Sequence, residues 1–131
     1  RIMPSFGTLK ADTLTHSTAG SLATNFVVEG SAKSYVSAII DSNTHTIQSS
    51  FNVASLTDDG AGRTDVVFTN SMNNDDYSAV STCALNGSNL FAHLGNNDLI
   101  TTSNYRNNTA LDSGSIVDYE VLCSNVHGEL A

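Results

Sequence analysis

The strongest constraint on the fold is the alternation, from Ser34 onward, of short strand-like runs with clusters of turn-forming residues. Inside the runs, apolar and polar residues alternate with the period of two that a half-buried strand requires, and no helical period is sustained over three turns. Ser, Thr and Asn make up 46 of the 131 residues, with one Pro and no Trp. Because these three residue types disfavour helix interiors, the composition also favours strands joined by polar turns. The predicted strands are residues 34–40, 46–57, 64–69, 77–85, 90–94, 99–103 and 116–124.

Seven short strands at this spacing predict an all-β domain over residues 34–131, an antiparallel β-sandwich or a small barrel, and we take the sandwich. Residues 1–33 differ, because Gly, Ser and Thr dominate and apolar residues are too sparse for a separate core. We therefore expect an extended N-terminal leader that packs on something else and serves assembly. Met3-Pro4 is one candidate for the start of the chain, with Arg1-Ile2 left from upstream, and the residues leave this open.

The charge balance excludes several classes of partner. The formal net charge is −8, with five Lys and Arg residues against 13 Asp and Glu. Such a surface repels phosphate backbones and anionic headgroups, so the sequence predicts neither a nucleic-acid partner nor membrane insertion. The longest apolar runs fall far short of the ~20 residues that span a bilayer. We expect a soluble protein made in a cytoplasm, with no cofactor.

An acidic, glycine-containing segment joins two of the predicted strands: Asp58-Asp59-Gly60-Ala61-Gly62. Its two glycines can supply the positive φ angles of a hairpin connection, and Asp side chains cap such turns by accepting from nearby backbone N–H groups. A calcium loop would need oxygen ligands at alternating positions and a distal bidentate carboxylate, which this segment lacks. We interpret the segment as a turn.

Other residue types that often carry chemistry do not form a recognisable motif. The four histidines are scattered, without the spacing of a metal site. The pairs Asp58-Asp59 and Asp75-Asp76 resemble the two carboxylates of a glycosidase on paper, but both lie in turn-like segments where Asp is expected. There is no Gly-x-Ser-x-Gly sequence. The sequence predicts no catalytic residue and no metal site.

The two cysteines, Cys83 and Cys123, lack the spacing of a metal knuckle or a redox pair. Strand alternation groups Cys83 with Tyr77 and Ala79, and Cys123 with Tyr119 and Val121. Both thiols are therefore predicted to face the core as small buried apolar groups. A disulfide between them is the alternative that the spacing leaves open.

A series of segments covering about residues 32–124 shares its order and spacing with a known kind of β-domain. The series is Ala32-Lys33 ahead of Tyr35-Val36, residues 50–62, a short strand ending in Phe68-Thr69, residues 72–77, Tyr105-Arg106-Asn107-Asn108, and the closing strand 117–123. In these segments the chain resembles the β-domain found at the ends of fibre and appendage proteins of tailed bacteriophages, common among marine phages. Residues 7–14 are similar to the short leader that opens many such virion proteins. Arg63-Thr64-Asp65 departs from the acidic-aromatic-Thr run usual in that family, which bears on ligand specificity more than on fold.

The resemblance implies a non-enzymatic virion structural protein, a fibre-like appendage or tail-fibre tip with host-surface glycan recognition. It also implies a homotrimer, whose contacts we expect at Leu9, Leu14, Phe26 and Val28, and docking of the leader on other virion proteins of the tail or capsid. A capsid-surface decoration fibre is the first alternative. A free carbohydrate-binding module is the alternative from another class, and an enzyme is the third.

Receptor contact is expected at polar loops, because a rigid sheet can present amides and hydroxyls to sugars without any catalytic residue. An aromatic ring and a guanidinium fork add to the amides in the loop expected at residues 104–114. The alternative is that these are ordinary solvated turns. The candidate receptor contacts are Asn86, Asn89, Asn96, Asn97, Tyr105, Arg106, Asn107 and Asn108.

Overall fold

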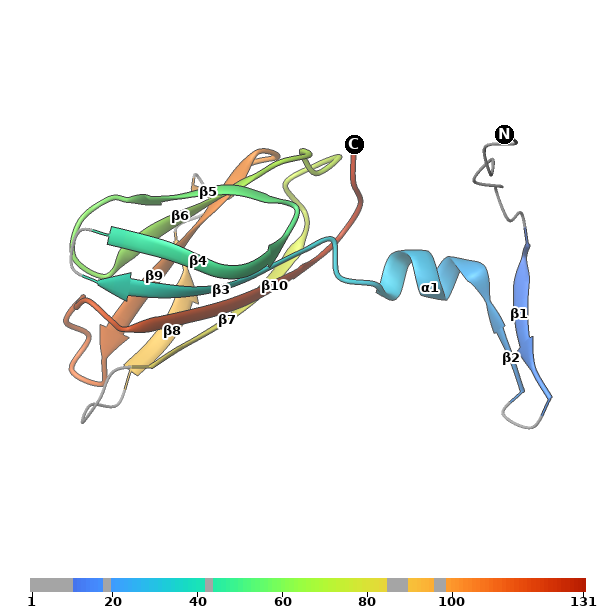
Figure 1. Cartoon of the computed structure of the whole chain (residues 1–131), viewed down its shortest axis with the longest axis horizontal. Coiled ribbons are helices and arrows are strands. Elements are labelled where there is room, and N and C mark those ends of the chain that lie inside the picture. Colours follow the sequence, from blue (N-terminus) through green and yellow to red (C-terminus); the bar gives the residue numbers. More distant parts are fainter. Residues whose placement is uncertain (1–10, 18–19, 42–43, 85–89, 96–98) are drawn as a thin grey trace, which may run out of the picture. The chain divides into compact units, whose positions relative to one another are not determined.

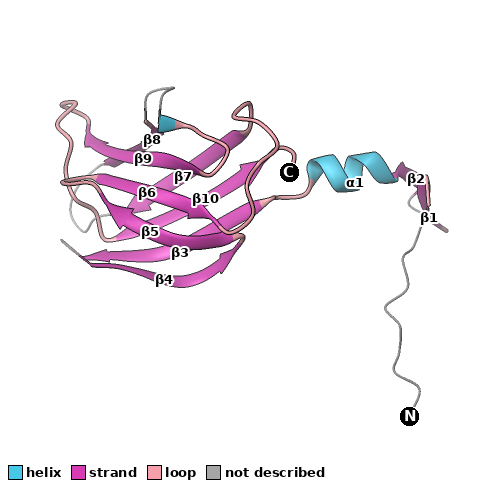
Figure 2. Cartoon of the chain, turned by 90° about the horizontal axis from the view of Figure 1, so that it is seen from above, coloured by secondary structure: helices cyan, strands magenta, loops and turns pink. Residues whose placement is uncertain are grey.

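Two antiparallel four-stranded sheets pack face to face in residues 32–131 (Figures 1 and 2). The computed structural model of the chain describes residues 11–17, 20–41, 44–84, 90–95 and 99–131. It divides the chain into a smaller unit, residues 1–31, and a larger unit, residues 32–131. The backbone N–H of Lys33 donates to the carbonyl oxygen of Val126 at 2.7 Å, so the larger unit begins just before its first strand.

The predicted all-β antiparallel sandwich is confirmed, with eight strands rather than seven among the described residues of the larger unit. We name each sheet after one of its central strands. The β3 sheet has the order β4-β3-β10-β7, and the β6 sheet has the order β5-β6-β9-β8. The strands are β3 (Ser34–Asp41), β4 (Thr44–Phe51), β5 (Val53–Asp58), β6 (Arg63–Phe68), β7 (Ser78–Ala84), β8 (Leu90–Leu94), β9 (Asn104–Leu111) and β10 (Val121–His127).

The additional strand arises because the run 46–57, predicted as one strand, is broken at Asn52. This residue has φ 55°, a left-handed conformation that Asn tolerates better than most side chains. Its Oδ1 accepts from the backbone N–H of Asn70 at 2.7 Å, and its Nδ2 donates to the carbonyl oxygen of Asn70 at 3.0 Å. The chain therefore leaves the β3 sheet at Phe51 and enters the β6 sheet at Val53.

The sequence placed a strand at 99–103 and a loop at 104–114, and both assignments are wrong. Residues 101–104 form a turn, in which the Thr101 hydroxyl donates to Asn104 Oδ1 at 2.7 Å, and β9 follows it. Asn is a weak strand former, but pairing of β9 with β6 on one side and β8 on the other overrides that preference.

The closing strand begins at Val121, later than the predicted start at residue 116. Its buried side chains are Leu122, Ser124 and Val126. The prediction that Val121 and Cys123 face the core is therefore wrong, because a shift of one residue moves every side chain of a strand to the other face. Tyr119, expected on the same face as these two, is buried but lies before the strand.

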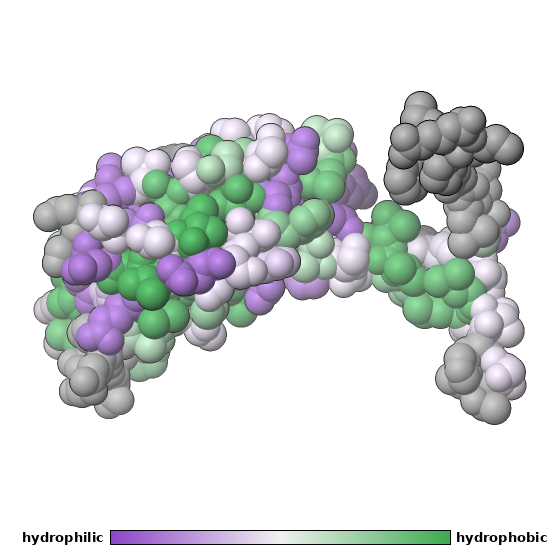
Figure 3. Space-filling model, viewed as in Figure 1, coloured by the Kyte–Doolittle hydropathy of each residue, from purple (hydrophilic) through white to green (hydrophobic). Residues whose placement is uncertain are grey.

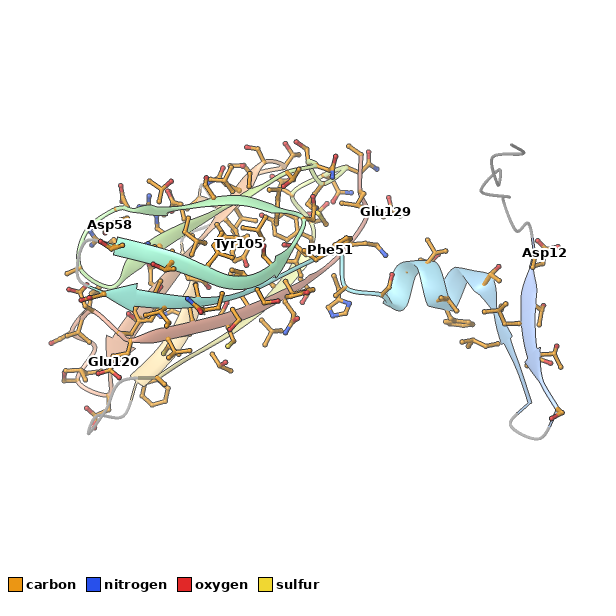
Figure 4. The ribbon with its side chains drawn as sticks, in the orientation of Figure 1. Asp12, Phe51, Asp58, Tyr105, Glu120 and Glu129 are labelled. Atoms are coloured by element: carbon orange, nitrogen blue, oxygen red, sulfur yellow. The ribbon has the colours of Figure 1, made fainter. Side chains whose placement is uncertain are left out.

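The core between the sheets is built around aromatic side chains. Phe68 lies with ring centroids 5.6 Å from both Tyr77 and Tyr105, and the last two are 6.3 Å apart. Figure 4 shows Tyr105 between the two sheets. Aliphatic residues on inward positions complete the core: Val36, Ala38, Ile40, Val66, Met72, Leu122 and Val126.

The smaller unit is not simply extended, because it contains a hairpin and a short helix. Strands β1 (Thr13–His16) and β2 (Gly20–Ala23) pair antiparallel, and α1 (Thr24–Gly30) follows. Apolar side chains of this unit are exposed, and Figure 3 shows them gathered over α1. No helix within the described residues is long and apolar enough to cross a membrane. The exposed apolar residues are Leu14, Leu22, Phe26, Val27 and Val28.

Candidate functional site

The acidic segment after β5 is a turn, as predicted. Gly60 and Gly62 have φ angles of 100° and 64°, which the glycines adopt without steric cost. The Gly60 N–H donates to Asp58 Oδ1 at 2.8 Å, and the Gly62 N–H donates to Asp118 Oδ1 at 2.7 Å. Figure 4 labels Asp58 at the end of the sandwich where β5 ends and β6 begins. The first carboxylate of the pair thus stabilises the turn.

Arg106 does not lie in a loop, and its guanidinium is already engaged. Its Nε and Nη2 donate to the two oxygens of Asp65, at 2.6 and 2.9 Å, and its Nη1 lies 2.5 Å from Asp59 Oδ2. The hydrogen bonds to Asp65, more than any other factor, raise the pKa of the guanidinium. This bidentate pair links β6 to β9 across their outer side. The prediction of Arg106 as a loop contact is wrong, because the residue lies within β9 and pairs with Asp65.

Tyr105 and Asn107 belong to the core, so they cannot contact a receptor from this position. Both side chains are fully buried. The Tyr105 hydroxyl donates to Ser124 Oγ at 2.8 Å, and the Ser81 hydroxyl donates to Asn107 Oδ1 at 2.5 Å. Burial raises the pKa of Tyr105 to about 12, against the lowering effect of the Ser124 hydrogen bond. Asn108 is half-buried in the same strand.

The other predicted receptor contacts, Asn86, Asn89, Asn96 and Asn97, lie outside the described residues, as does the predicted trimer contact Leu9. A candidate recognition site must therefore be sought on surfaces other than the run 105–108. Strand alternation could have flagged the error, because Tyr105 and Asn107 share one face while Arg106 and Asn108 share the other.

The remaining acidic pair, Asp75-Asp76, lies on the surface ahead of β7. The Asp76 N–H donates to Asn74 Oδ1 at 3.1 Å, which is the geometry of an Asx turn. Over the described ranges, no group of three or more His, Cys, Asp and Glu side chains lies close enough to share a metal ion.

The two cysteines are free thiols on opposite faces of the β3 sheet. Cys83 is the register partner of inward-facing Leu122, whereas Cys123 is the partner of exposed Thr82. Burial raises the pKa of the Cys83 thiol. Cys123 Sγ lies outside, 3.8 Å from Ser37 Oγ. A disulfide, the alternative left open by the sequence, would have to pass through the sheet.

The outer face of the β3 sheet is a surface that the sequence interpretation missed. Three rows of side chains cross the centre of this face, and each row has one side chain from each of the four strands. The rows contain apolar, hydroxyl, thiol and amide side chains but no charged side chain. We call these three rows the uncharged face. The signal was in β3 itself, where Tyr35 and Ile39 alternate with buried Val36 and Ile40, so the strand is apolar on both faces. From the register, the rows are Phe51, Tyr35, Asn125 and Val80; Ser49, Ser37, Cys123 and Thr82; and Thr46, Ile39, Val121 and Ala84.

An aromatic pair lies at one end of the uncharged face. Tyr35 and Phe51 are register partners, and their rings have centroids 6.4 Å apart and planes inclined by 25°. The two residues are 39% and 51% exposed. The Tyr35 hydroxyl lies 3.5 Å from Ser49 Oγ, two residues along β4, so this ring leans along the sheet instead of standing upright on it. Figure 4 labels Phe51 at the end of β4.

Comparison with known proteins gives no match, whether with a protein-family model, a curated protein or a solved structure. The resemblance to phage fibre domains therefore stays a prediction from the sequence. We infer function from that prediction together with the two exposed apolar surfaces, one in each unit.

Proposed function

We propose that this chain is a non-enzymatic structural protein of a bacteriophage virion, assembled in the host bacterial cytoplasm into a fibre-like appendage or the tip of a tail fibre. The observation that supports it best is that the smaller unit exposes apolar surface, whereas the sandwich has a core of its own. A segment of this kind gains stability by assembling with other chains.

The elements of the smaller unit are too short to be stable alone. A hairpin with strands of four residues and a helix of seven are both below the sizes that persist in water without further packing. Leu14, Leu22 and Phe26 are each more than 40% exposed, so their burial is left to an assembly partner. Other copies of the same segment would bury the same kind of surface in return.

A homotrimer is the assembly we propose, with Leu14, Phe26 and Val28 among its contacts and Leu9 as a further one. Each chain carries a formal charge of −8, so copies repel one another unless they meet through apolar surface. The smaller unit offers such surface. Docking on other proteins of the tail or capsid would use the same unit, leaving the sandwich free to face the host.

Mass spectrometry of purified virions tests the virion assignment. The protein should be present in the particles, and immunogold labelling should then place it on the tail rather than on the capsid surface. Labelling on the capsid would favour the alternative of a decoration fibre. If infected cells produce the protein but purified virions lack it, the proposal is overturned. A free carbohydrate-binding module would then be favoured, with the uncharged face as its binding surface.

An enzyme assay addresses the remaining alternative. Glycan and ester substrates incubated with the purified chain should show no turnover. Turnover that is abolished by Asp75→Asn or Asp76→Asn would contradict the non-enzymatic assignment, because these carboxylates lie exposed and outside the β5–β6 turn.

A further inference from the structure

We propose that the uncharged face of the β3 sheet binds a neutral saccharide, with Tyr35 and Phe51 as the platform on which a sugar ring stacks. This proposal rests on the proposed function, in which the sandwich faces the host, and adds to it a recognition site and a class of ligand. It moves recognition from the loops predicted by the sequence to the flat side of a sheet.

The absence of charge on this face selects the class of ligand. The chain holds 18 charged residues, and none occupies the twelve positions of the uncharged face. With a net charge of −8, the protein repels anionic polymers, and a cationic ligand would find no carboxylate within these rows. A charged ligand would lose hydration on this face without gaining an oppositely charged side chain, whereas a neutral ligand would not.

The side chains present on the face match the two kinds of surface that a sugar offers. Exposed aromatic rings pack against the apolar C–H face of a pyranose, and the two rings here are inclined by only 25° to each other, with the Tyr35 hydroxyl extending toward Ser49. Hydroxyl and amide groups next to the rings can exchange hydrogen bonds with sugar hydroxyls. Ser49 follows along β4, and Asn125 lies beside Tyr35 on β10.

The size of the face argues against a second copy of the chain as its occupant. Four strands about 4.8 Å apart and three rows about 7 Å apart cover roughly 400 Å². A stable protein interface buries about 800 Å² on each partner, so this face alone would not hold two chains together. It is instead within the range of functional surface patches on single chains.

Affinity electrophoresis of the full chain through neutral polysaccharides tests the proposal. We would use dextran, mannan, laminarin and xyloglucan, with dextran sulfate as the anionic counterpart of dextran. At least one neutral polymer should retard the protein, and dextran sulfate should not. Phe51→Ala and Tyr35→Ala should each weaken retardation about tenfold, the value of one lost aromatic contact. Phe91→Ala is the matched control, because Phe91 is 58% exposed on the other sheet, and it should bind like the parent.

Two outcomes would overturn the proposal directly: no retardation by any neutral polymer, or an equal loss for Phe91→Ala. A change in mass on light scattering for Phe51→Ala would instead assign the face to contact between copies, and so also overturn it. Amide NMR shifts of the unmodified chain on titration with the best oligosaccharide should centre on Tyr35, Ser49, Phe51 and Asn125. Shifts centred elsewhere would contradict the site even if binding occurs.

A negative result in the virion experiment can be distinguished from a negative result in the saccharide experiment. A chain that is present in virions but binds no neutral polysaccharide would keep its structural role and lose this site. A chain that binds through the uncharged face but is absent from virions would keep the site and act as a free binding module.

Discussion

At the scale of single residues, the two glycines of the β5–β6 turn differ in a way that a melting experiment can resolve. Gly60 has φ 100° and open space where a Cβ would lie. Gly62 has φ 64°, and a Cβ there would collide with the carbonyl oxygens of Val117 and Thr109. Gly60→Ala should cost about 1–2 kcal/mol from backbone conformation alone. Gly62→Ala should cost roughly twice as much, because overpacking is added to strain.

Urea unfolding of the two variants and the parent measures this difference. Gly114→Ala is a suitable control, since Gly114 also has positive φ, 82°, and open space at the Cβ position. It should resemble Gly60→Ala. Equal losses for Gly60→Ala and Gly62→Ala would contradict the close approach of the turn to the segment before β10.

The buried tyrosines make stability sensitive to alkaline pH. Burial raises the pKa of Tyr119 from 10.0 to about 12, despite the opposing effect of its hydrogen bond with Thr64. A phenol whose pKa is higher in the folded state stabilises the fold fully below the unfolded pKa, near 10, and this contribution is lost as pH rises toward 12. The loss attributable to Tyr119 should approach roughly 3 kcal/mol in full, and about half of it should be reached by about pH 11.

Urea unfolding at pH values from 8 to about 11 checks this expectation. Tyr119→Phe removes the titrating group, so its free energy of unfolding should fall less steeply over the alkaline range than that of the parent. It will be lower at pH 8, because the hydrogen bond with Thr64 is lost. Parallel pH curves for parent and variant would contradict the raised pKa.

At the scale of elements, the register of β10 decides the state of the cysteines. The strand pairs with β7 so that Cys83 faces inward and Cys123 outward. Protein that is purified and denatured without any reductant should therefore take up two alkyl groups from iodoacetamide. Dithiothreitol should leave the melting temperature of the folded chain unchanged. Uptake of no alkyl group, together with a lower melting temperature on reduction, would establish a disulfide and refute the register.

At the scale of the whole molecule, assembly and folding should be separable. The core of the larger unit draws all its residues from 36–126, so a chain lacking residues 1–31 should keep a cooperative melt. The full chain should scatter light as a species near three times 13.8 kDa, and the shortened chain as a single copy.

A point variant of the smaller unit gives a finer test of the same prediction. Phe26→Ser should weaken assembly, whereas Phe91→Ser, at a similarly exposed position in the sandwich, should not. A full chain of single-copy mass at micromolar concentration would contradict the trimer.

The fold class, several strands and the acidic turn could be predicted from the amino-acid sequence alone. These features depend on neighbours in the chain: the period-two alternation of β3, and the Asp-Gly chemistry between β5 and β6. The sequence also favoured neither nucleic acid nor membrane as a partner, because net charge and the length of apolar runs are properties of composition.

Which face of each strand is covered depends on contacts between segments that are distant in the sequence. Asn52 breaks a continuous strand pattern because two sheets must be joined there, and Asn107 is buried against the other sheet, where the Ser81 hydroxyl donates to its Oδ1. The uncharged face came from four strands drawn from residues 34–41, 44–51, 78–84 and 121–127. Its charge-free rows exist only in the register that pairs them, since hydrogen bonding between distant strands, and not local propensity, sets which side chains become neighbours.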